Sequence, residues 1–140
     1  MIVYLAHDYG GKEKNIIESM MFASEIEKEF PDFVIINPLL VFANRKYQGS
    51  NKGWYEDITR CLKLLAKCEA LILSGDWRHS PGCCAELGYA AALNLPTMFY
   101  TKEHKLEIPD NLDLFLRDIT APENKRTCGH KSTGIGKGSH

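Results

Sequence analysis

The sequence lacks the features and motifs that characterise several large classes of protein. It has no run of about 18 apolar residues, which predicts no membrane span, and residues 1–6 lack the basic segment that opens a signal peptide. It contains no G-x-G-x-x-G or Walker fingerprint and no G-x-S-x-G motif. These absences argue against a dehydrogenase, a P-loop enzyme and an α/β-hydrolase. We therefore expect a cytoplasmic protein that does not bind a membrane.

Cysteine is present but in no recognisable framework. The chain has five cysteines, an odd number, and none of them forms a C-x-x-C pair. The adjacent Cys83 and Cys84 could indicate a metal or redox site, but a helix with small buried residues explains them more simply. We expect reduced thiols, no metal site and no cofactor.

The chain has almost no excess of charge of either sign, but its charges are unevenly distributed along the sequence. The formal net charge is −1, yet residues 123–140 hold four basic side chains against one acidic, which leaves residues 1–122 at −4. Residues 1–122 are mildly acidic and lack the basic surface that binds nucleic acid, so we expect no nucleic-acid partner. The basic, glycine-rich segment 123–140 has too few apolar residues to offset its ordering entropy. We predict one domain over 1–122 and a disordered tail over 123–140.

Short apolar runs alternate with longer amphipathic ones along the chain. We predict helices over 13–30, 55–68, 82–93 and 111–117, a loop over 41–53, and strands over 2–6, 33–36, 70–74 and 97–100. Continuous apolar strands joined by helices indicate a parallel sheet covered on both faces. The predicted fold class is therefore α/β, a small doubly wound parallel sheet of flavodoxin or Rossmann type with four or five strands.

Polar side chains gather after two of these strands. Because parallel strands end at one edge of the sheet, where open α/β sheets bind ligands, we expect the two loops to share a crevice. The candidate substrate-binding residues from the first loop are His7, Asp8, Tyr9, Gly10 and Gly11. Those from the second are Trp77, His79, Ser80 and Gly82, with Asp76 and Glu86 as candidate catalytic carboxylates.

Glu86 is the strongest single candidate for chemistry. It sits near the start of a small-residue helix at the carboxyl edge, where a carboxylate can serve as nucleophile or base. The alternative is an acid favoured at this place only by the helix dipole. Ser80 followed by Pro81 also has a structural explanation, since serine at the N-cap and proline at the first helical position start a helix well.

These segments resemble the nucleoside 2-deoxyribosyltransferase superfamily over about residues 1–101. The resemblance is greatest to its short bacterial and phage branch, and the relatives include the 2′-deoxynucleoside 5′-monophosphate N-glycosidases. It rests on strand 2–6 with its Gly-Gly loop and on the pattern Trp77-x-x-Ser80-x-Gly82-x-x-x-Glu86-Leu87-Gly88-Tyr89-Ala90. The resemblance implies that Glu86 attacks the anomeric carbon C1′ of a deoxyribose and that Tyr4 orients Glu86. It places Ser80 where the glycosidases bind phosphate.

The chain departs from the family pattern in two places. The family's second carboxylate falls here on Cys61, and the nearest acid is Asp57, one helical turn earlier. Asp57 either substitutes for it or is a solvated acid in the first turn of a helix. The first loop carries Asp8 and Gly10 where the glycosidases have serine and arginine, and Asp8 would repel a phosphate.

Two functions of different kinds remain open from the sequence. The first is an enzyme that cleaves or transfers the N-glycosidic bond of a small-molecule nucleoside or nucleotide, with Asp57 or Asp76 assisting the leaving base. Trp77, Tyr9 and Trp54 are candidates for stacking on that base. The second is a non-catalytic binding protein on the same fold; a flavodoxin-like interaction module explains the polar crevice less well. We also expect a homo-oligomer, because segment 41–55 is rich in aromatic residues.

Overall fold

The computed structural model describes residues 1–43 and 51–109 of the 140. The expected helix over 111–117, the domain boundary at 122 and the tail over 123–140 lie outside the described residues and stay predictions. Residues Met1–Glu107 form one compact unit, and only residues 108 and 109 of the second unit, Ile108–His140, are described. The fold below is that of the first unit.

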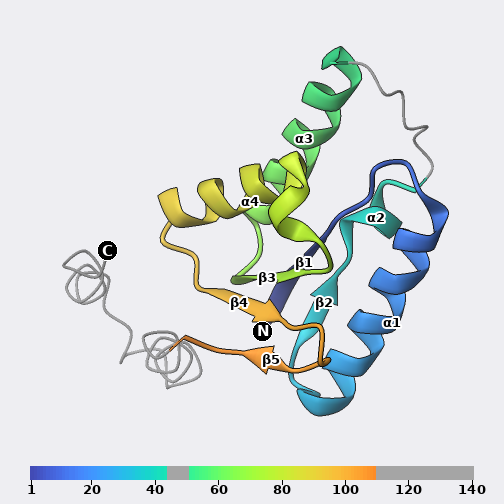
Figure 1. Cartoon of the computed structure of the whole chain (residues 1–140). Coiled ribbons are helices and arrows are strands. Elements are labelled where there is room, and N and C mark those ends of the chain that lie inside the picture. The colour runs from blue at the N-terminus through green and yellow to red at the C-terminus, as the bar shows by residue number, and fades with distance from the viewer. Residues whose placement is uncertain (44–50, 110–140) are drawn as a thin grey trace. The chain divides into compact units, whose positions relative to one another are not determined.

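The first unit is built on a five-stranded sheet with the strand order β2-β1-β3-β4-β5 (Figure 1). The first four strands run parallel and β5 pairs antiparallel with β4. The strands are β1 (Ile2–His7), β2 (Val34–Ile36), β3 (Ala70–Ser74), β4 (Thr97–Tyr100) and β5 (Leu106–Glu107). The α/β class and the doubly wound parallel sheet are confirmed.

Helices cover both faces of the sheet. They are α1 (Glu13–Glu29), α2 (Pro38–Val41), α3 (Asn51–Leu65), the 3-10 turn η1 (Trp77–His79) and α4 (Pro81–Ala92). Figure 1 shows α1 on one side of the sheet and α3 and α4 on the other. None of the described helices is long and apolar enough to cross a membrane.

Alternation along the strands divides the core between the two faces. Because successive side chains of a strand point to opposite faces, Tyr4 and Leu71 pack with Leu65 of α3 and Ala90 of α4. The side chain at the next position of each strand points to the opposite face of the sheet, which α1 covers. Every residue of β3 is buried, as expected for a parallel strand covered on both sides.

The segment expected as a loop over 41–53 is partly helical, so that prediction is wrong at both ends. Val41 ends α2, a four-residue helix too short to show a periodic pattern. Asn37 caps α2, since its side-chain oxygen accepts a hydrogen bond from the Leu39 amide at 3.1 Å. At the other end α3 begins at Asn51 and includes a buried Gly53, so packing there outweighs the low helix propensity of glycine.

Two further elements were not predicted from the sequence. The 3-10 turn η1 precedes α4, and β5 adds an antiparallel edge to the sheet. The connection to β5 contains His104 with a φ of 59°, a left-handed conformation for which a non-glycine residue gives little sequence signal.

Candidate active site

A cavity of about 240 Å³ opens at the carboxyl ends of the strands on the α3 and α4 face. The loop after β1 forms one wall, α2 a second, and α3 and the start of α4 close the rest. It is lined by His7, Tyr9, Gly10, Pro38, Leu39, Trp54, Asp57, Ile58, Cys61, Ser80, Pro81, Gly82, Cys83 and Glu86. The sequence predicted a crevice at this edge, and the structure shows one.

Tyr4 and Glu86 form a buried pair beside this cavity. Tyr4 on β1 is fully buried, and Glu86 on α4 is 5% exposed. The Tyr4 hydroxyl donates a short hydrogen bond to Oε2 of Glu86, across 82 positions of sequence. Tyr4 and Glu86 are therefore in direct contact, and the roles that the resemblance implies for them stay predictions. One carboxylate oxygen of Glu86 is held by the sheet.

Burial sets the electrostatics of the pair. Loss of hydration raises the pKa of Glu86 to about 7, although the hydrogen bond from Tyr4 acts in the opposite direction. Burial, followed by the charge of Glu86, raises the pKa of Tyr4 far above its usual value of 10. Tyr4 is therefore a permanent hydrogen-bond donor, while Glu86 changes its charge near neutral pH.

The start of α4 brings Glu86 to the cavity. Ser80 is the N-cap, and its hydroxyl accepts a hydrogen bond from the Cys83 amide at 3.2 Å. Pro81 occupies the first helical turn, where its fixed φ favours the helix. The structural explanation of the Ser80-Pro81 pair is confirmed, and Ser80 also lies in the cavity wall.

Asp57 and Cys61 lie one turn apart on α3, and both line the cavity. They also line an adjoining hollow of about 100 Å³, which Arg60, Ile16 and Phe42 help to enclose. Burial raises the pKa of the Cys61 thiol to about 11, with Glu86 as the second cause. Cys61 is therefore an uncharged thiol close to Glu86, and Asp57 is the second carboxylate of the cavity wall.

Several candidate residues lie away from this cavity. Asp8, Gly11, Asp76, Trp77 and His79 are not among the described residues that line it. Asp76, which precedes η1, and His79 at the end of η1 are exposed, and Oδ1 of Asp76 lies 2.7 Å from Nδ1 of His79. The Trp77 ring packs on Phe99 of β4, with ring centroids 5.6 Å apart. The roles expected for these residues in substrate binding, and for Asp76 in catalysis, stay predictions. Their positions outside the cavity lining do not support these roles.

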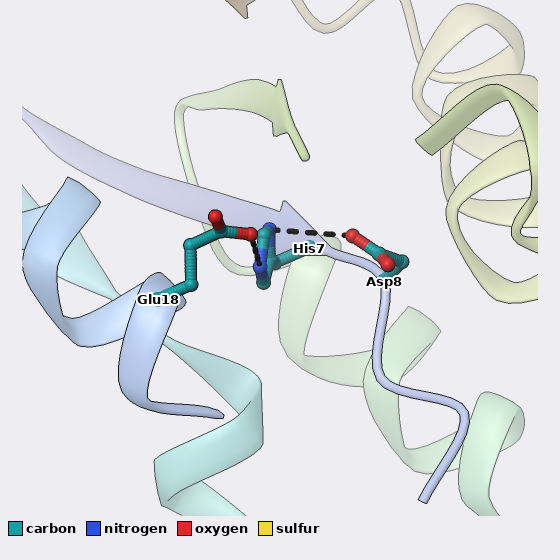
Figure 2. Close-up of side chains that lie close together, drawn as sticks. All are labelled: His7, Asp8 and Glu18. Atoms are coloured by element: carbon teal, nitrogen blue, oxygen red, sulfur yellow. Dashed lines mark ion pairs between the residues drawn. The ribbon is translucent and has the colours of Figure 1, made fainter. Parts of the chain in front are cut away.

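His7 forms part of the cavity wall, but its imidazole belongs to the opposite face. The ring packs edge-on against Phe22 of α1 at 5.5 Å, and Figure 2 shows it between Asp8 and Glu18. The alternation of β1 explains this, because Tyr4 and His7 are three positions apart and point to opposite faces.

Sequence reasoning missed the apolar part of the wall. Pro38, Leu39, Ile58 and Cys83 line the cavity but carry no chemical motif. Ile58 and Cys61 did show helical spacing toward the sheet, which is a signal for a buried face. The short helix α2 gave no comparable signal.

Comparison with known proteins supports the fold. The sequence matches no protein-family model and no curated protein. Among solved structures, the chain is similar to a 2-deoxyribosyltransferase from the psychrotolerant bacterium Bacillus psychrosaccharolyticus, at a TM-score of 0.53 and 18% sequence identity. The match covers 71% of this chain and 71% of that one. The chain thus has the fold of a nucleoside 2-deoxyribosyltransferase.

The raised pKa of Glu86 predicts that its contribution to the free energy of unfolding decreases as pH rises. The folded-state pKa of about 7 exceeds the ordinary value of 4.5, so the folded state holds the proton more tightly. The resulting stability is complete below pH 4.5 and is lost as pH rises through 7. We expect the free energy of unfolding of Glu86→Gln, whose amide oxygen still accepts from Tyr4, to exceed that of the wild type by roughly 3 kcal/mol at pH 8, with little difference at pH 4.5.

Urea unfolding of both proteins at the two pH values measures this difference. Glu27→Gln, an exposed acid on α1, is the matched control and should show no such pH dependence. An equal effect of Glu86→Gln at both pH values would contradict the assignment of a buried, titrating carboxylate.

Proposed function

We propose that this protein cleaves or transfers the N-glycosidic bond of a nucleoside, with Glu86 as the nucleophile. The observation that carries the proposal is the buried Tyr4–Glu86 pair in the wall of a cavity at the carboxyl edge. The fold similarity to a 2-deoxyribosyltransferase supports the same reaction class. That relative is described as a biocatalyst for the synthesis of nucleosides.

The reaction would proceed in two displacements at C1′ of the sugar. The ionised carboxylate of Glu86 forms a bond to C1′ while the C1′–N bond breaks, and the base departs with the bonding electron pair and takes up a proton. Water or a second base then attacks C1′ and releases Glu86. An anion on the sugar face stabilises the oxocarbenium-like charge of both steps. Tyr4 holds one oxygen of Glu86 and so fixes the direction of the other.

Asp57 is the group we propose to assist the leaving base. It occupies the cavity wall together with Glu86, whereas Asp76 lines a different hollow. Cys61 remains a neutral thiol, since its pKa is raised to about 11, and supplies no charge. The second carboxylate of the site would then come from one turn earlier on α3 than in the family pattern.

The charges of the cavity favour a nucleoside over a nucleotide. The charged side chains among its described lining residues are Asp57 and Glu86, and no lysine or arginine is among them. A phosphate group placed in this cavity would lie near the carboxylate of Glu86, which repels it when ionised. Asp8 was expected to repel a phosphate, but it is not among the described residues that line the cavity, and its Oδ1 accepts a hydrogen bond from the Asp76 amide at 3.0 Å.

A non-catalytic binding protein is the second candidate. The observation that favours it is Cys61 at the position of the family's second acid. Binding without turnover would leave the nucleoside intact. The two functions therefore separate in one experiment.

Incubation with a mixture of deoxynucleosides at pH 8, followed by chromatography of the products, tests the proposal. We expect release of free base or exchange between bases, and loss of at least 1,000-fold in rate for Glu86→Gln, because the amide has no anionic oxygen to attack C1′. Turnover should increase as pH rises through about 7, where Glu86 ionises. Binding of a nucleoside without any product would favour the second candidate.

The role of Asp57 is tested by a pair of substitutions on the same helix. We expect Asp57→Asn to lower kcat by about 100-fold, within the range for a lost general acid. Cys61→Ser keeps a small neutral donor at the neighbouring position and should change kcat by less than about 5-fold. The opposite ranking of the two variants would show that Cys61 and not Asp57 assists the leaving base.

We further propose that the protein assembles as a homo-oligomer. Large apolar side chains on α1 and α2 are exposed, with Ile17 at 54%, Met21 at 49% and Val41 at 51%. Ile17 and Val41 are the sequence neighbours of Ile16 and Phe42, which help to enclose the hollow beside the cavity. An isologous contact would cover them. Light scattering at micromolar concentration should give at least twice the chain mass of 15.8 kDa, and a monomeric mass would contradict this proposal.

A further inference from the structure

We propose that His7, Asp8 and Glu18 form a binding site for a divalent transition-metal cation, on the sheet face opposite the Glu86 cavity. Figure 2 shows the three side chains together, two from the end of β1 and one from α1. Each offers one ligand atom, and these atoms lie within 4.8 Å of one another. The inference does not depend on the proposed function.

The hydrogen bonds of Ser74 determine which nitrogen of His7 is available. The Ser74 hydroxyl donates its hydrogen to the Ala6 carbonyl at 2.9 Å. Its oxygen must then accept in the contact with Nδ1 of His7, at 3.1 Å. Nδ1 therefore carries the hydrogen, and Nε2 of the neutral ring has a free lone pair.

That lone pair points into the cluster without a hydrogen-bond partner. His7 is 5% exposed, and its Nε2 is the buried side-chain atom among the described residues for which no hydrogen bond is found. It lies 3.1 Å from Oε1 of Glu18. A lone pair and a carboxylate oxygen repel each other at this distance unless a proton or a metal cation lies between them. Two ligands about 2.1 Å from one ion, at nearly a right angle, lie about 3 Å apart.

Asp8 supplies the third ligand and is already held in place. Its ligand oxygen lies within 4.8 Å of those of His7 and Glu18, and its Oδ1 accepts a hydrogen bond from the Asp76 amide at 3.0 Å. Such a fixed hydrogen bond to a ligating carboxylate is typical of metal sites. Gly75 leaves the space for this arrangement, because a Cβ at that position would overlap both Asp8 and His7. Its φ of 67° also favours glycine.

A hollow that Glu18 lines offers a cation a route to the cluster. This hollow of about 390 Å³ is lined by Glu18, Phe22, Gly75, Asp76, Tyr100, Thr101, Lys102 and His104. The Glu18 side chain is 47% exposed, so it can complete the coordination without unfolding. Lys102 is the basic group of the hollow, and Glu18 and Asp76 are its acidic groups.

The donor set selects the class of cation. One imidazole with two carboxylates suits Mn²⁺, Co²⁺ or Zn²⁺ better than Ca²⁺ or Mg²⁺, which prefer oxygen ligands throughout. Binding would link α1 to the end of β1, directly before Tyr9 and Gly10 in the wall of the Glu86 cavity. We therefore expect the cation to increase stability and to order this loop.

Titration of the full chain with Mn²⁺ at pH 7.5, with free Mn²⁺ followed by electron paramagnetic resonance, tests the site. Mn²⁺ is chosen because it prefers oxygen and nitrogen to the thiols of this chain. We expect one bound ion per chain and a higher Tm on saturation. Glu18→Gln should weaken binding at least 10-fold, since it removes a charged ligand from an accessible position.

Glu27→Gln on the same helix is the matched control, and it should bind Mn²⁺ as the wild type does. Circular dichroism of the metal-free proteins verifies that Glu18→Gln is folded. Absence of binding by the wild type at millimolar Mn²⁺ would overturn the proposal. Equal affinity of Glu18→Gln and wild type would overturn it as well.

Discussion

The hydrogen bond from Tyr4 to Glu86 connects the sheet to the helix that carries the candidate nucleophile. A carboxylate buried to this degree costs free energy when it is charged, and the single donor from β1 recovers only part of that cost. The raised pKa of Glu86, to about 7, is the result. The N-cap at Ser80 and the packing of α4 on β3 place this carboxylate at the carboxyl edge of the sheet, in the wall of the cavity. The ionised form of Glu86, which the proposed reaction needs, is therefore also the form that destabilises the fold.

Much of the fold was predictable because its signals are local. The apolar strands β1, β3 and β4 and the helix begun by Ser80 and Pro81 follow from composition and capping. The antiparallel β5 has two residues and α2 has four, so neither is long enough to show a periodicity. Side-chain direction was the other limit. The sequence placed His7 and Glu86 at one edge, but the register of β1 decides that the His7 ring belongs to the opposite face.

The carboxyl edge thus has two chemically distinct sides. The side that α3 and α4 cover holds a cavity with two carboxylates, Asp57 and Glu86. The side that α1 covers holds the cluster of His7, Asp8 and Glu18. Glu18 lay outside every sequence motif, because it follows Asp8 by ten positions on a different element and meets it only through the packing of α1 on the sheet. Strand β1 contributes to both sides, and its loop lies between them.

The proposed reaction requires a covalent bond between Glu86 and C1′ of the sugar. The direct measurement is mass spectrometry of the protein after rapid quenching with acid during turnover of a deoxynucleoside, followed by peptide mapping. We expect the peptide that contains Glu86 to gain the mass of one deoxyribosyl group, and Glu86→Gln to gain none. A deoxyribosyl group attached to another residue, or turnover by Glu86→Gln at the wild-type rate, would contradict the account.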